Sequence, residues 1–426
     1  MHDWSLSRRA FLASTATALG ASHGLIGQAQ DDNKPPAQQW SNWSGAVTCH
    51  PRTIAAPTSE EQVVQHVAAA ARANVPVRVA ASGHSFVPIC ASQGTLLSLD
   101  GLTGLVGTDE ANQTATFLAG TKIHQMGEPL FQAGLAMENM GDIDRQGIAG
   151  AISTGTHGTG KGIGSISTQV AGLRMITAGG EVLECSAESQ PDVFKAAQVS
   201  LGSLGIITQV TLRCLPAYRL HEKTWQVPFE ECVADLDKLI AGNRHFEFFW
   251  LPRNDACSMK SLNPTDSAPN DLPDRKGERI GHSHRIFPSV RNNKFNEIEF
   301  SLPEENGLDC LKELRELMQT KHKDVSWPLE YRTLAADDIL ISTAQGRETI
   351  AISAHQSSQL PHEAFFADVE SIFRNHRGRP HWGKMHTHKA EELSRLYPKW
   401  DEFHAIRERL DPDGRFLNDF LRRIFT

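Results

Sequence analysis

The chain has 426 residues, 40% of them hydrophobic and 22% charged, and a formal net charge of −8 at pH 7. This length exceeds one ordinary hydrophobic core and favours two domains of roughly 150–250 residues each. The composition is typical of a soluble globular protein, and the acidic balance argues against a nucleic-acid-binding surface, which needs clustered Lys and Arg. Seven scattered cysteines without a CxxC pair indicate neither a disulfide scaffold nor a cysteine zinc site.

The N-terminal segment follows the plan of an export signal. Ser7-Arg8-Arg9-Ala10-Phe11-Leu12 precedes a mildly apolar run to Ile26, and Gly27-Gln28-Ala29 offers small residues for cleavage. The run is too short and too mildly apolar for a membrane-spanning helix, and its two arginines resemble the twin-arginine signal. We expect a twin-arginine-type signal peptide over 1–29, a linker over 30–42, and a periplasmic or secreted protein without stable membrane insertion. An ordinary secretory signal or a disordered arm is the alternative.

Helices and strands are mixed between residues 43 and 216. The pattern predicts a helix from about residue 60, opened by a Thr58–Glu61 capping box, and a second helix over about 121–134. Strands are predicted over 75–80, 95–99, 114–119 and 205–212, with a hairpin over 170–177 and 181–185 that turns at Gly179-Gly180. This mixture with a hairpin favours the α+β class over a doubly wound sheet.

Beyond Pro216 the pattern changes. Strand-like runs and amphipathic stretches occupy 222–260 and 295–355, with a helix predicted around 308–319. The segment 263–294 is polar and rich in Pro, Asn, Asp and Arg, which predicts a long loop. We therefore expect a second domain that is built on a sheet.

Two segments rich in small residues point to an anionic ligand. VAASGHS, residues 79–85, places a Ser-Gly-His-Ser loop behind a predicted strand, where backbone N–H groups can approach a phosphate closely. GDIDRQGIAGAISTGTHGTGKGIG, residues 141–164, has eight glycines interrupted by apolar residues, which indicates a folded wrap around a ligand rather than a linker. It follows neither the Walker pattern nor GxGxxG. Structural glycines at turns and an ordinary polar histidine are the alternatives.

Four ordered motifs carry a resemblance to a known family: Gly-His-Ser at 83–85, IAGAISTGTHGTG at 148–160, SLGSLGIITQVTL at 200–212 and RPHWGKMH at 379–386. Over residues 43–426 the chain resembles flavoproteins of the vanillyl-alcohol-oxidase type. Within them it is similar to sugar-1,4-lactone oxidases, such as D-arabinono- and L-gulono-1,4-lactone oxidase, and to bacterial alditol oxidase. The resemblance implies an α+β protein with a two-subdomain FAD-binding domain over 43–216 and a sheet-based substrate (cap) domain over 217–426, whose segment 379–426 returns to the flavin.

The resemblance also implies the cofactor and its site. The loop 79–85 would bind the FAD pyrophosphate through backbone N–H groups, and His84 would be bonded covalently to the 8α-methyl of the isoalloxazine. Imidazole suits this role because a neutral ring nitrogen is a nucleophile. A second bond through cysteine is not expected, since no Cys lies between Cys90 and Cys185. The implied cofactor-binding residues are Val79, Ala80, Ala81, Ser82, Gly83, His84, Ser85, Asp142, Gly147, Gly150, Thr154, Gly155, Thr156, His157, Ile206 and Ile207.

Two further motifs point to the chemistry. Glu330 and Arg332 alternate on a predicted strand, so they share one face and can grip sugar hydroxyls; an ordinary ion pair is the alternative. In the resemblance Glu-x-Arg is the substrate-binding pair and His-Trp-Gly-Lys at 381–384 is another active-site block, in which Lys384 supplies positive charge and His381 contacts substrate and accepts a proton. The implied catalytic residues are Glu330, Arg332, His381 and Lys384, and the implied substrate-binding residues are Asp142, Glu330, Arg332, His355 and His381.

Three details refine these expectations. Asp142 stands where an alditol oxidase would have a substrate-touching Ser, so it changes the preferred polyol or lactone or faces solvent. Gly141 is small, which in relatives leaves room for oxygen and favours an oxidase. His381, His386 and His388 have the spacing H-x4-H-x-H, which fits no helical zincin pattern, so we expect no metal.

The expected activity is FAD-dependent oxidation of a CH–OH group of a sugar lactone or polyol. Hydride would pass to flavin N5, and oxygen would be the acceptor, giving hydrogen peroxide, as in D-arabinono-1,4-lactone oxidase. The expected partners are the small-molecule substrate, oxygen and the twin-arginine export machinery, without nucleic acid. The alternatives are an alditol oxidase, a quinone- or cytochrome-linked dehydrogenase, a periplasmic sugar-binding protein without a redox cofactor, and a metal-dependent hydrolase that uses the C-terminal histidines.

Overall fold

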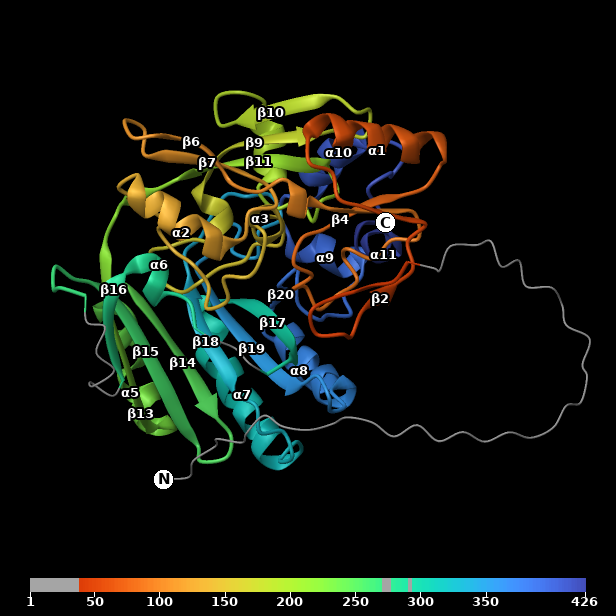
Figure 1. The fold of residues 1–426 in the computed structure, drawn as a ribbon. Coiled ribbons are helices and arrows are strands. Elements are labelled where there is room, and N and C mark those ends of the chain that lie inside the picture. The colour runs from red at the N-terminus through yellow and green to blue at the C-terminus, as the bar shows by residue number, and fades with distance from the viewer. Residues whose placement is uncertain (1–37, 270–276, 290–292) are drawn as a thin grey trace, which may run out of the picture. The chain divides into compact units, whose positions relative to one another are not determined.

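The computed structural model describes residues 38–269, 277–289 and 293–426, which Figure 1 draws in colour. The predicted export signal lies outside these residues. We expected regular structure to begin at residue 43. It begins earlier, because Trp40–Ser41 (β1) pairs with Thr48–Cys49 (β2) in an antiparallel ribbon. The last residues of the expected linker 30–42 are therefore part of a strand and its turn. Among the described helices, none is long and apolar enough to cross a membrane.

A small parallel sheet carries the Gly-His-Ser loop. Its three described strands lie in the order β3-β5-β4, and β4 runs directly into residues 81–85. The predicted cap of helix α1 is wrong by one residue, because the side chain of Ser59 accepts from the backbone of Gln62 and the side chain of Gln62 accepts from the backbone of Thr58. The bounds are Thr53–Ala55 for β3, Glu60–Arg72 for α1, Val77–Ala80 for β4, Thr95–Ser98 for β5 and Leu99–Gly101 for the 3-10 helix η1.

A sheet of five described strands, all antiparallel, occupies the upper part of Figure 1 in the order β10-β9-β11-β7-β6. The predicted hairpin is confirmed as β9 and β10. Helix α3 is the first helix of the glycine-rich segment 141–164, and it packs against β11. The bounds are Leu105–Asp109 for β6, Thr114–Leu118 for β7, Ile123–Gln132 for α2, Leu135–Ala136 for β8, Ile148–Ser153 for α3, Ile166–Gln169 for η2, Val170–Ile176 for β9, Val182–Ser186 for β10, Pro191–Ala197 for α4, Ile206–Arg213 for β11 and Leu215–Pro216 for β12.

A larger antiparallel sheet of eight described strands occupies the lower part of Figure 1, in the order β16-β13-β15-β14-β18-β19-β17-β20. The expected long loop over 263–294 is wrong in part, since it contains β16 and α6. Its polar residues suit an edge strand, whose pairing with β13 comes from the backbone. The bounds are Arg219–Pro228 for β13, Phe229–Gly242 for α5, His245–Leu251 for β14, Ala256–Pro264 for β15, Glu278–His282 for β16, Ser283–Ile286 for α6, Phe295–Pro303 for β17, Glu304–Asn306 for η3, Gly307–Thr320 for α7, Leu329–Leu334 for β18, Thr349–Ser357 for β19, Glu363–Asn375 for α8 and Arg379–Pro380 for β20.

The two faces of this sheet differ in chemistry. Along each central strand the side chains alternate, and every second residue, such as Phe248, Tyr331 and Ile352, packs with helices α5, α7 and α8 in a hydrophobic core. The intervening residues, such as Glu247 and Arg332, are also buried or nearly so, yet they are charged. Because only one face of the sheet is used for the hydrophobic core, the opposite, charged face is available to form a site.

The C-terminal segment returns to the first part of the chain. Helices α9 (Ala390–Leu396), α10 (Trp400–Leu410) and α11 (Asp419–Phe425) contribute Leu393, Phe403 and Leu421, respectively, to the core that also holds Val67 and Phe117. The backbone N–H of Phe86 donates to the carbonyl of Gly383 at 2.7 Å. The His-Trp-Gly-Lys motif is therefore held beside the Gly-His-Ser loop, although about 300 residues separate them.

Candidate active site

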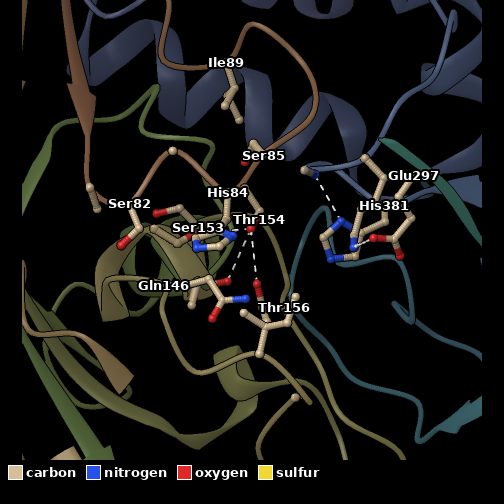
Figure 2. A pocket seen from close by; sticks show the side chains of 18 of the residues that line it. Ser82, His84, Ser85, Ile89, Gln146, Ser153, Thr154, Thr156, Glu297 and His381 are labelled. Atoms are coloured by element: carbon tan, nitrogen blue, oxygen red, sulfur yellow. Dashed lines mark hydrogen bonds and ion pairs between the residues drawn. The ribbon is translucent and has the colours of Figure 1, made fainter. Parts of the chain in front are cut away.

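One cavity of about 550 Å³ lies between the loops of the first half of the chain and the polar face of the eight-stranded sheet. Figure 2 looks into it and shows His84 near Ser85 and Gln146, with Glu297 and His381 to one side. The first side is lined by residues that include 81–85, 141–143, 146, 147, 149–151, 153, 154, 156, 157 and 205–207, and the sheet side by residues that include Phe249, Ser258, Glu297, Glu299, Glu330, Arg332, His355, His381 and Lys384.

The structure brings nearly all predicted site residues to this cavity. Every predicted catalytic and substrate-binding residue lines it, and so do fourteen of the sixteen predicted cofactor residues. The exceptions are Ala80, which is 3% exposed and packs in the protein core, and Gly155, whose backbone has φ +72° in the turn after α3. Both residues shape the chain beside the cavity rather than its wall.

The loop after β4 is suited to hold an anion. The backbone N–H groups of Ser82, Gly83, His84 and Ser85 donate to no acceptor within the described residues. Gly83 has φ +63°, a left-handed conformation that favours glycine, and it lets the chain turn so that successive N–H groups are presented together. Such a concave row of N–H groups is a common anion-binding arrangement.

The floor of the cavity near this loop is made of residues with little or no side chain. A Cβ added to Gly147 would lie 2.8 Å from the Cβ of Ala81, and one added to Gly150 would lie 3.9 Å from the same atom. Close approach of the glycine-rich segment to the loop therefore depends on glycine at 147. A smooth surface of this kind accommodates a flat or extended ligand close to the backbone.

His84 offers a free and neutral imidazole. Neither ring nitrogen makes a hydrogen bond within the described residues, and the residue lines the cavity. Burial lowers the pKa of His84 to about 4, and the positive charges of Lys384, Lys122 and Arg145 act in the same direction. The ring is therefore unprotonated at neutral pH, with a lone pair available on one nitrogen.

The sheet side of the cavity carries a cluster of four charged groups, Arg332, Glu330, Glu247 and Lys260, and Asp142 joins it from the first side. Arg332 Nε donates to Glu247 Oε2 at 2.9 Å, and its guanidinium also pairs with Glu330. Lys260 Nζ lies 2.6 Å from Asp142 Oδ1 and 3.1 Å from Glu247 Oε1. Burial opposes the charge of Arg332, but the carboxylates of Glu330, Glu247 and Asp142 raise its pKa well above the usual value. The guanidinium is thus a fixed cation at the cavity wall.

A second group of charges lies under the His-Trp-Gly-Lys motif. Glu297 pairs with Lys384 and has its Oε1 3.5 Å from His355 Nε2. Burial would raise the pKa of Glu297, but Lys384 and His355 lower it to about 2. For His355 burial lowers the pKa and Glu297 raises it, with a net rise above 6.5. Its Nδ1 faces the carbonyl of Pro328 at 3.0 Å, so the neutral ring carries its lone pair on Nε2.

His381 has a different tautomer. Its Nδ1 accepts a hydrogen bond from the backbone N–H of Gly383 at 3.0 Å, so the proton of the neutral ring is on Nε2. Burial lowers the pKa of His381 to about 4, against the opposing charge of Glu299. Glu299 in turn lies 2.8 Å from His157 Nε2. In this form His381 is a hydrogen-bond donor, which differs from the proton acceptor that we expected.

The rival metal set of three C-terminal histidines is not assembled. His381 is grouped with His157 and Glu299, whereas His388 Nδ1 lies 3.1 Å from Glu370 Oε1 and His386 packs against the rings of Trp382 and Phe420. Within the described residues, three other sets of acidic and histidine side chains lie close enough to share an ion, and all three border this cavity: His157, Glu299 and His381; Glu297, Glu330 and His355; and Asp142, Glu247 and Glu330.

Sequence reasoning missed four charged residues of the site: Glu247, Lys260, Glu297 and Glu299. A signal was present in Phe295–Pro303, where Glu297 and Glu299 alternate with large apolar residues, whereas Glu247 and Lys260 stand singly in His245–Leu251 and Ala256–Pro264. A strand with this pattern has one apolar and one charged face, and a charged face that is buried must meet partners. The partners lie on other strands, so the pattern indicates a polar face without identifying it as a site.

The geometry fits a flavin dinucleotide. Free N–H groups at Ser82–Ser85 suit a diphosphate, the floor at Gly147 and Gly150 suits close contact with an extended molecule, and His84 presents a free ring nitrogen to the same space. The charged wall across the cavity leaves room for a second, polar molecule. This division into an anion-binding side and a charged side is the one a cofactor and a hydroxylated substrate require.

Comparisons with known proteins agree with this reading. Residues 51–186 match the FAD binding domain family, and residues 210–278 and 274–424 match the D-arabinono-1,4-lactone oxidase family. The chain is 36% identical over 424 residues to L-gulono-1,4-lactone dehydrogenase of Mycobacterium tuberculosis, covering 90% of this chain and 98% of that protein. It is 30% identical over 431 residues to L-gulonolactone oxidase of Bos taurus, covering 91% and 98%.

Two solved structures share the fold. Cholesterol oxidase from B. sterolicum superposes with a TM-score of 0.82 at 16% identity, covering 94% of this chain and 100% of that one. Chitooligosaccharide oxidase superposes with a TM-score of 0.72 at 14% identity, covering 90% and 94%. At these identities the likeness concerns the fold alone, and it confirms the predicted α+β architecture with an FAD-binding part and a sheet-rich cap.

Proposed function

Because the chain belongs to the family of FAD-dependent sugar-1,4-lactone oxidases and dehydrogenases, we propose that it oxidises a CH–OH group of a sugar-1,4-lactone with oxygen as electron acceptor, giving hydrogen peroxide. The observation that carries the proposal is the single cavity, with free N–H groups and His84 on one side and the Glu330–Arg332 pair on the other. When bound, FAD supplies the two-electron acceptor that takes a hydride from the hydroxyl-bearing carbon.

The chain's first half holds the cofactor in this proposal. The N–H groups of Ser82–Ser85 bind the pyrophosphate, Gly147 and Gly150 let the cofactor lie close to the backbone, and Ile206 and Ile207 line the adenine side. His84 is bonded to the 8α-methyl carbon of the flavin. Support for the bond comes from its unprotonated ring and unshared nitrogens, since a nucleophile needs a free lone pair.

Arg332 and Glu330 bind the substrate. Glu247 and Glu330 hold the planar guanidinium from two directions, so its remaining N–H groups are presented to the cavity in a fixed orientation. Glu330 is also hydrogen-bonded by Ser353 Oγ at 3.2 Å. Burial raises the pKa of Glu330, with Glu247 and Asp142 acting in the same direction and Arg332 against it. The pair therefore offers both a donor and an acceptor for sugar hydroxyls.

The hydroxyl proton goes to Nε2 of His355. This nitrogen carries the lone pair of the neutral ring, and the imidazolium that forms is stabilised by Glu297 at 3.5 Å. His381, whose Nε2 carries a proton, donates a hydrogen bond to the substrate oxygen instead. Lys384 adds a positive charge at the same wall, which stabilises negative charge that develops on the oxygen or on the reduced cofactor.

The electron acceptor and the alditol alternative need separate tests. The relative from Mycobacterium tuberculosis is named a dehydrogenase and the one from Bos taurus an oxidase. The oxidase assignment is supported by Gly141, which lines the cavity and leaves space, since an added Cβ would meet only the carbonyls of His157 at 3.2 Å and Ile143 at 4.0 Å. Reduction of the bound flavin with lactone under nitrogen, followed by mixing with air, distinguishes an oxidase from a dehydrogenase. Slow return of oxidised flavin would identify a dehydrogenase.

Export and domain division complete the proposal. The Arg8-Arg9 pair and the apolar run to Ile26 support twin-arginine export to the periplasm or medium. Replacing both arginines with lysine should retain the protein in the cytoplasm, and unchanged secretion would argue against this route. The FAD-binding domain spans 43–216 and the substrate domain 217–426, of which 379–426 contacts the cofactor side, as the bond from Phe86 to Gly383 supports.

The first experiment is an absorption spectrum of the purified protein, followed by acid precipitation. We expect flavin in the pellet for the native chain and for His50→Ala, an exposed histidine that serves as control. His84→Ala should release its flavin into the supernatant. A colourless native protein would contradict the FAD assignment and favour a sugar-binding protein. Oxygen uptake with L-gulono- and D-arabinono-1,4-lactone, against an alditol such as xylitol, then tests the substrate class.

A further inference from the structure

The orientation of the His84 ring depends on an aromatic contact. Since neither ring nitrogen is hydrogen-bonded within the described residues, polar contacts do not fix its rotation. The indole of Trp43 stacks on the ring, with the centroids 5.3 Å apart and the planes at 26°. Trp43 is absent from the residues described as lining the cavity, so it stands behind the imidazole rather than in the ligand space.

Trp43 is itself held from several sides. Its backbone N–H donates to the carbonyl of Gly83 at 2.7 Å, the residue that precedes His84. Its ring meets Phe86 at 6.3 Å and Phe295 at 5.3 Å, in both cases edge to face. Phe86 belongs to the same loop as His84, and Phe295 belongs to β17. The indole is therefore wedged between the loop and the large sheet, and cannot turn without breaking contacts with both.

The neighbouring residue ties the same segment to the loop. Asn42 is 6% exposed, and its side-chain amide donates to the carbonyl of Ser85 at 3.0 Å. Its side-chain oxygen accepts from the backbones of Gly45 and Val47, both at 3.0 Å. Bonds from residues 42 and 43 thus meet the loop on either side of His84. A turn braced in this way transmits the position of the indole to the imidazole.

From this geometry we infer that Trp43 is the positioning residue that aims His84 for its covalent bond to the flavin. The inference rests on the proposed function, which assigns that bond to His84. Overall, the ring nitrogen replaces one hydrogen of the 8α-methyl group. That hydrogen and the imidazole's own hydrogen leave with two electrons to dioxygen, which is reduced to hydrogen peroxide. Bond formation requires a lone pair held at a fixed angle to one carbon, and a freely rotating imidazole would meet that condition rarely.

The test compares four chains after expression with ample riboflavin: native, Trp43→Phe, Trp43→Leu and Trp225→Ala. Phe keeps an aromatic ring, while Leu keeps apolar bulk without one. Trp225 is a half-buried tryptophan of β13 whose ring meets Phe246, and it does not line the described cavity, so it controls for loss of an indole. Each protein is measured for total bound flavin, for the fraction that remains in an acid-precipitated pellet, for the rate at which that fraction grows in air with added FAD, and for its melting temperature.

We expect attachment in Trp43→Leu to be roughly tenfold slower than in the native chain, the scale of effect that loss of an aromatic contact on a positioned nucleophile produces. Total bound flavin should change little, so the missing covalent fraction appears in the supernatant. Trp43→Phe should recover most of the native rate, and Trp225→Ala should match it. A general loss of folding would lower total flavin and melting temperature together, and would not be rescued selectively by Phe.

Three outcomes would overturn the inference. Equal attachment rates in Trp43→Leu and Trp43→Phe, with native flavin in the pellet, would show that the stacked ring has no role while leaving the proposed function intact. Equal slowing in Trp43→Leu and Trp225→Ala would assign the effect to general destabilisation. Native protein that holds FAD but releases all of it into acid would contradict the covalent bond itself, and the inference would fall with it, although the lactone-oxidising activity would remain testable.

Discussion

Replacing Lys260 with Met should destabilise the protein through the two carboxylates that it leaves behind. Lys260 lies on β15 with its side chain 13% exposed, 2.6 Å from Asp142 and 3.1 Å from Glu247, whose side chains are 10% and 5% exposed. Burial disfavours the ammonium charge, but Asp142 and Glu247 raise its pKa above 10.5, so the charge is present at neutral pH. Met is also unbranched and flexible, so it keeps most of the apolar stem while it removes the ammonium group, with its charge and its hydrogen bond to Asp142.

The expected cost follows from this burial. Removal of one partner from a buried pair leaves an uncompensated charge and typically costs about 3–5 kcal/mol. For a body of nearly 400 described residues this corresponds to a fall in melting temperature of roughly 3–10 °C. Adding Asp142→Asn removes one of the abandoned charges, so the double variant should recover about 1–3 kcal/mol of the loss. Such a recovery would show that Lys260 and Asp142 interact energetically and are not only close in space.

The assay is a thermal melt at pH 7, combined with the KM for lactone. Arg332 shares Glu247 with Lys260 and has its Nη2 3.9 Å from Asp142, so loss of Lys260 draws the guanidinium toward these carboxylates and should raise KM. Lys399→Met is the matched control, because its pair with Glu402 is exposed and worth at most about 0.5 kcal/mol. A Lys260→Met chain that melts with the Lys399→Met control would refute this account of the charged cluster.

Two other predictions test the proposed proton acceptor and the cofactor floor. If His355 Nε2 accepts the proton, kcat/KM should fall as the pH drops below the raised pKa of His355, since the ring must be neutral. His355→Gln should lose about 100-fold in rate and should also lose this pH dependence. If kcat/KM of that variant still falls at low pH as in the native chain, another group is the base. Gly147→Ala should cost about 1–3 kcal/mol and reduce FAD retention, because its Cβ would lie 2.8 Å from Ala81. Gly242→Ala is the control: its added Cβ meets nothing within 4 Å, so FAD retention should be unchanged. Equal flavin content in the two variants would contradict the role of Gly147 in letting FAD lie close to the backbone.

Local sequence patterns predicted the elements that carry their own signals. The strand before Ser82, the hairpin at Gly179-Gly180 and the Glu-x-Arg strand all depend on residues next to one another, and the structure has each of them. The same holds for the glycine-rich segment, whose need for small residues is visible in composition. The polar edge strand β16 was missed because its pairing depends on a neighbour more than fifty residues earlier.

The sequence by itself thus determined the Gly-His-Ser loop, the glycine floor of the cavity and the sign of the charge on several site residues. Turn geometry, side-chain alternation and residue type all act over a few positions. Only the tertiary structure decided which charges meet. Glu247, Lys260 and Arg332 converge because the order β15-β14-β18 and the register of its pairs bring them to one face. Asp142 joins them from the loop before α3, which precedes Arg332 by 190 residues in the chain. It likewise decided the hydrogen bonds that separate His355 from His381 and the stacking of Trp43 on His84. Register and strand order depend on the packing of the whole sheet, so no short stretch of the chain encodes them.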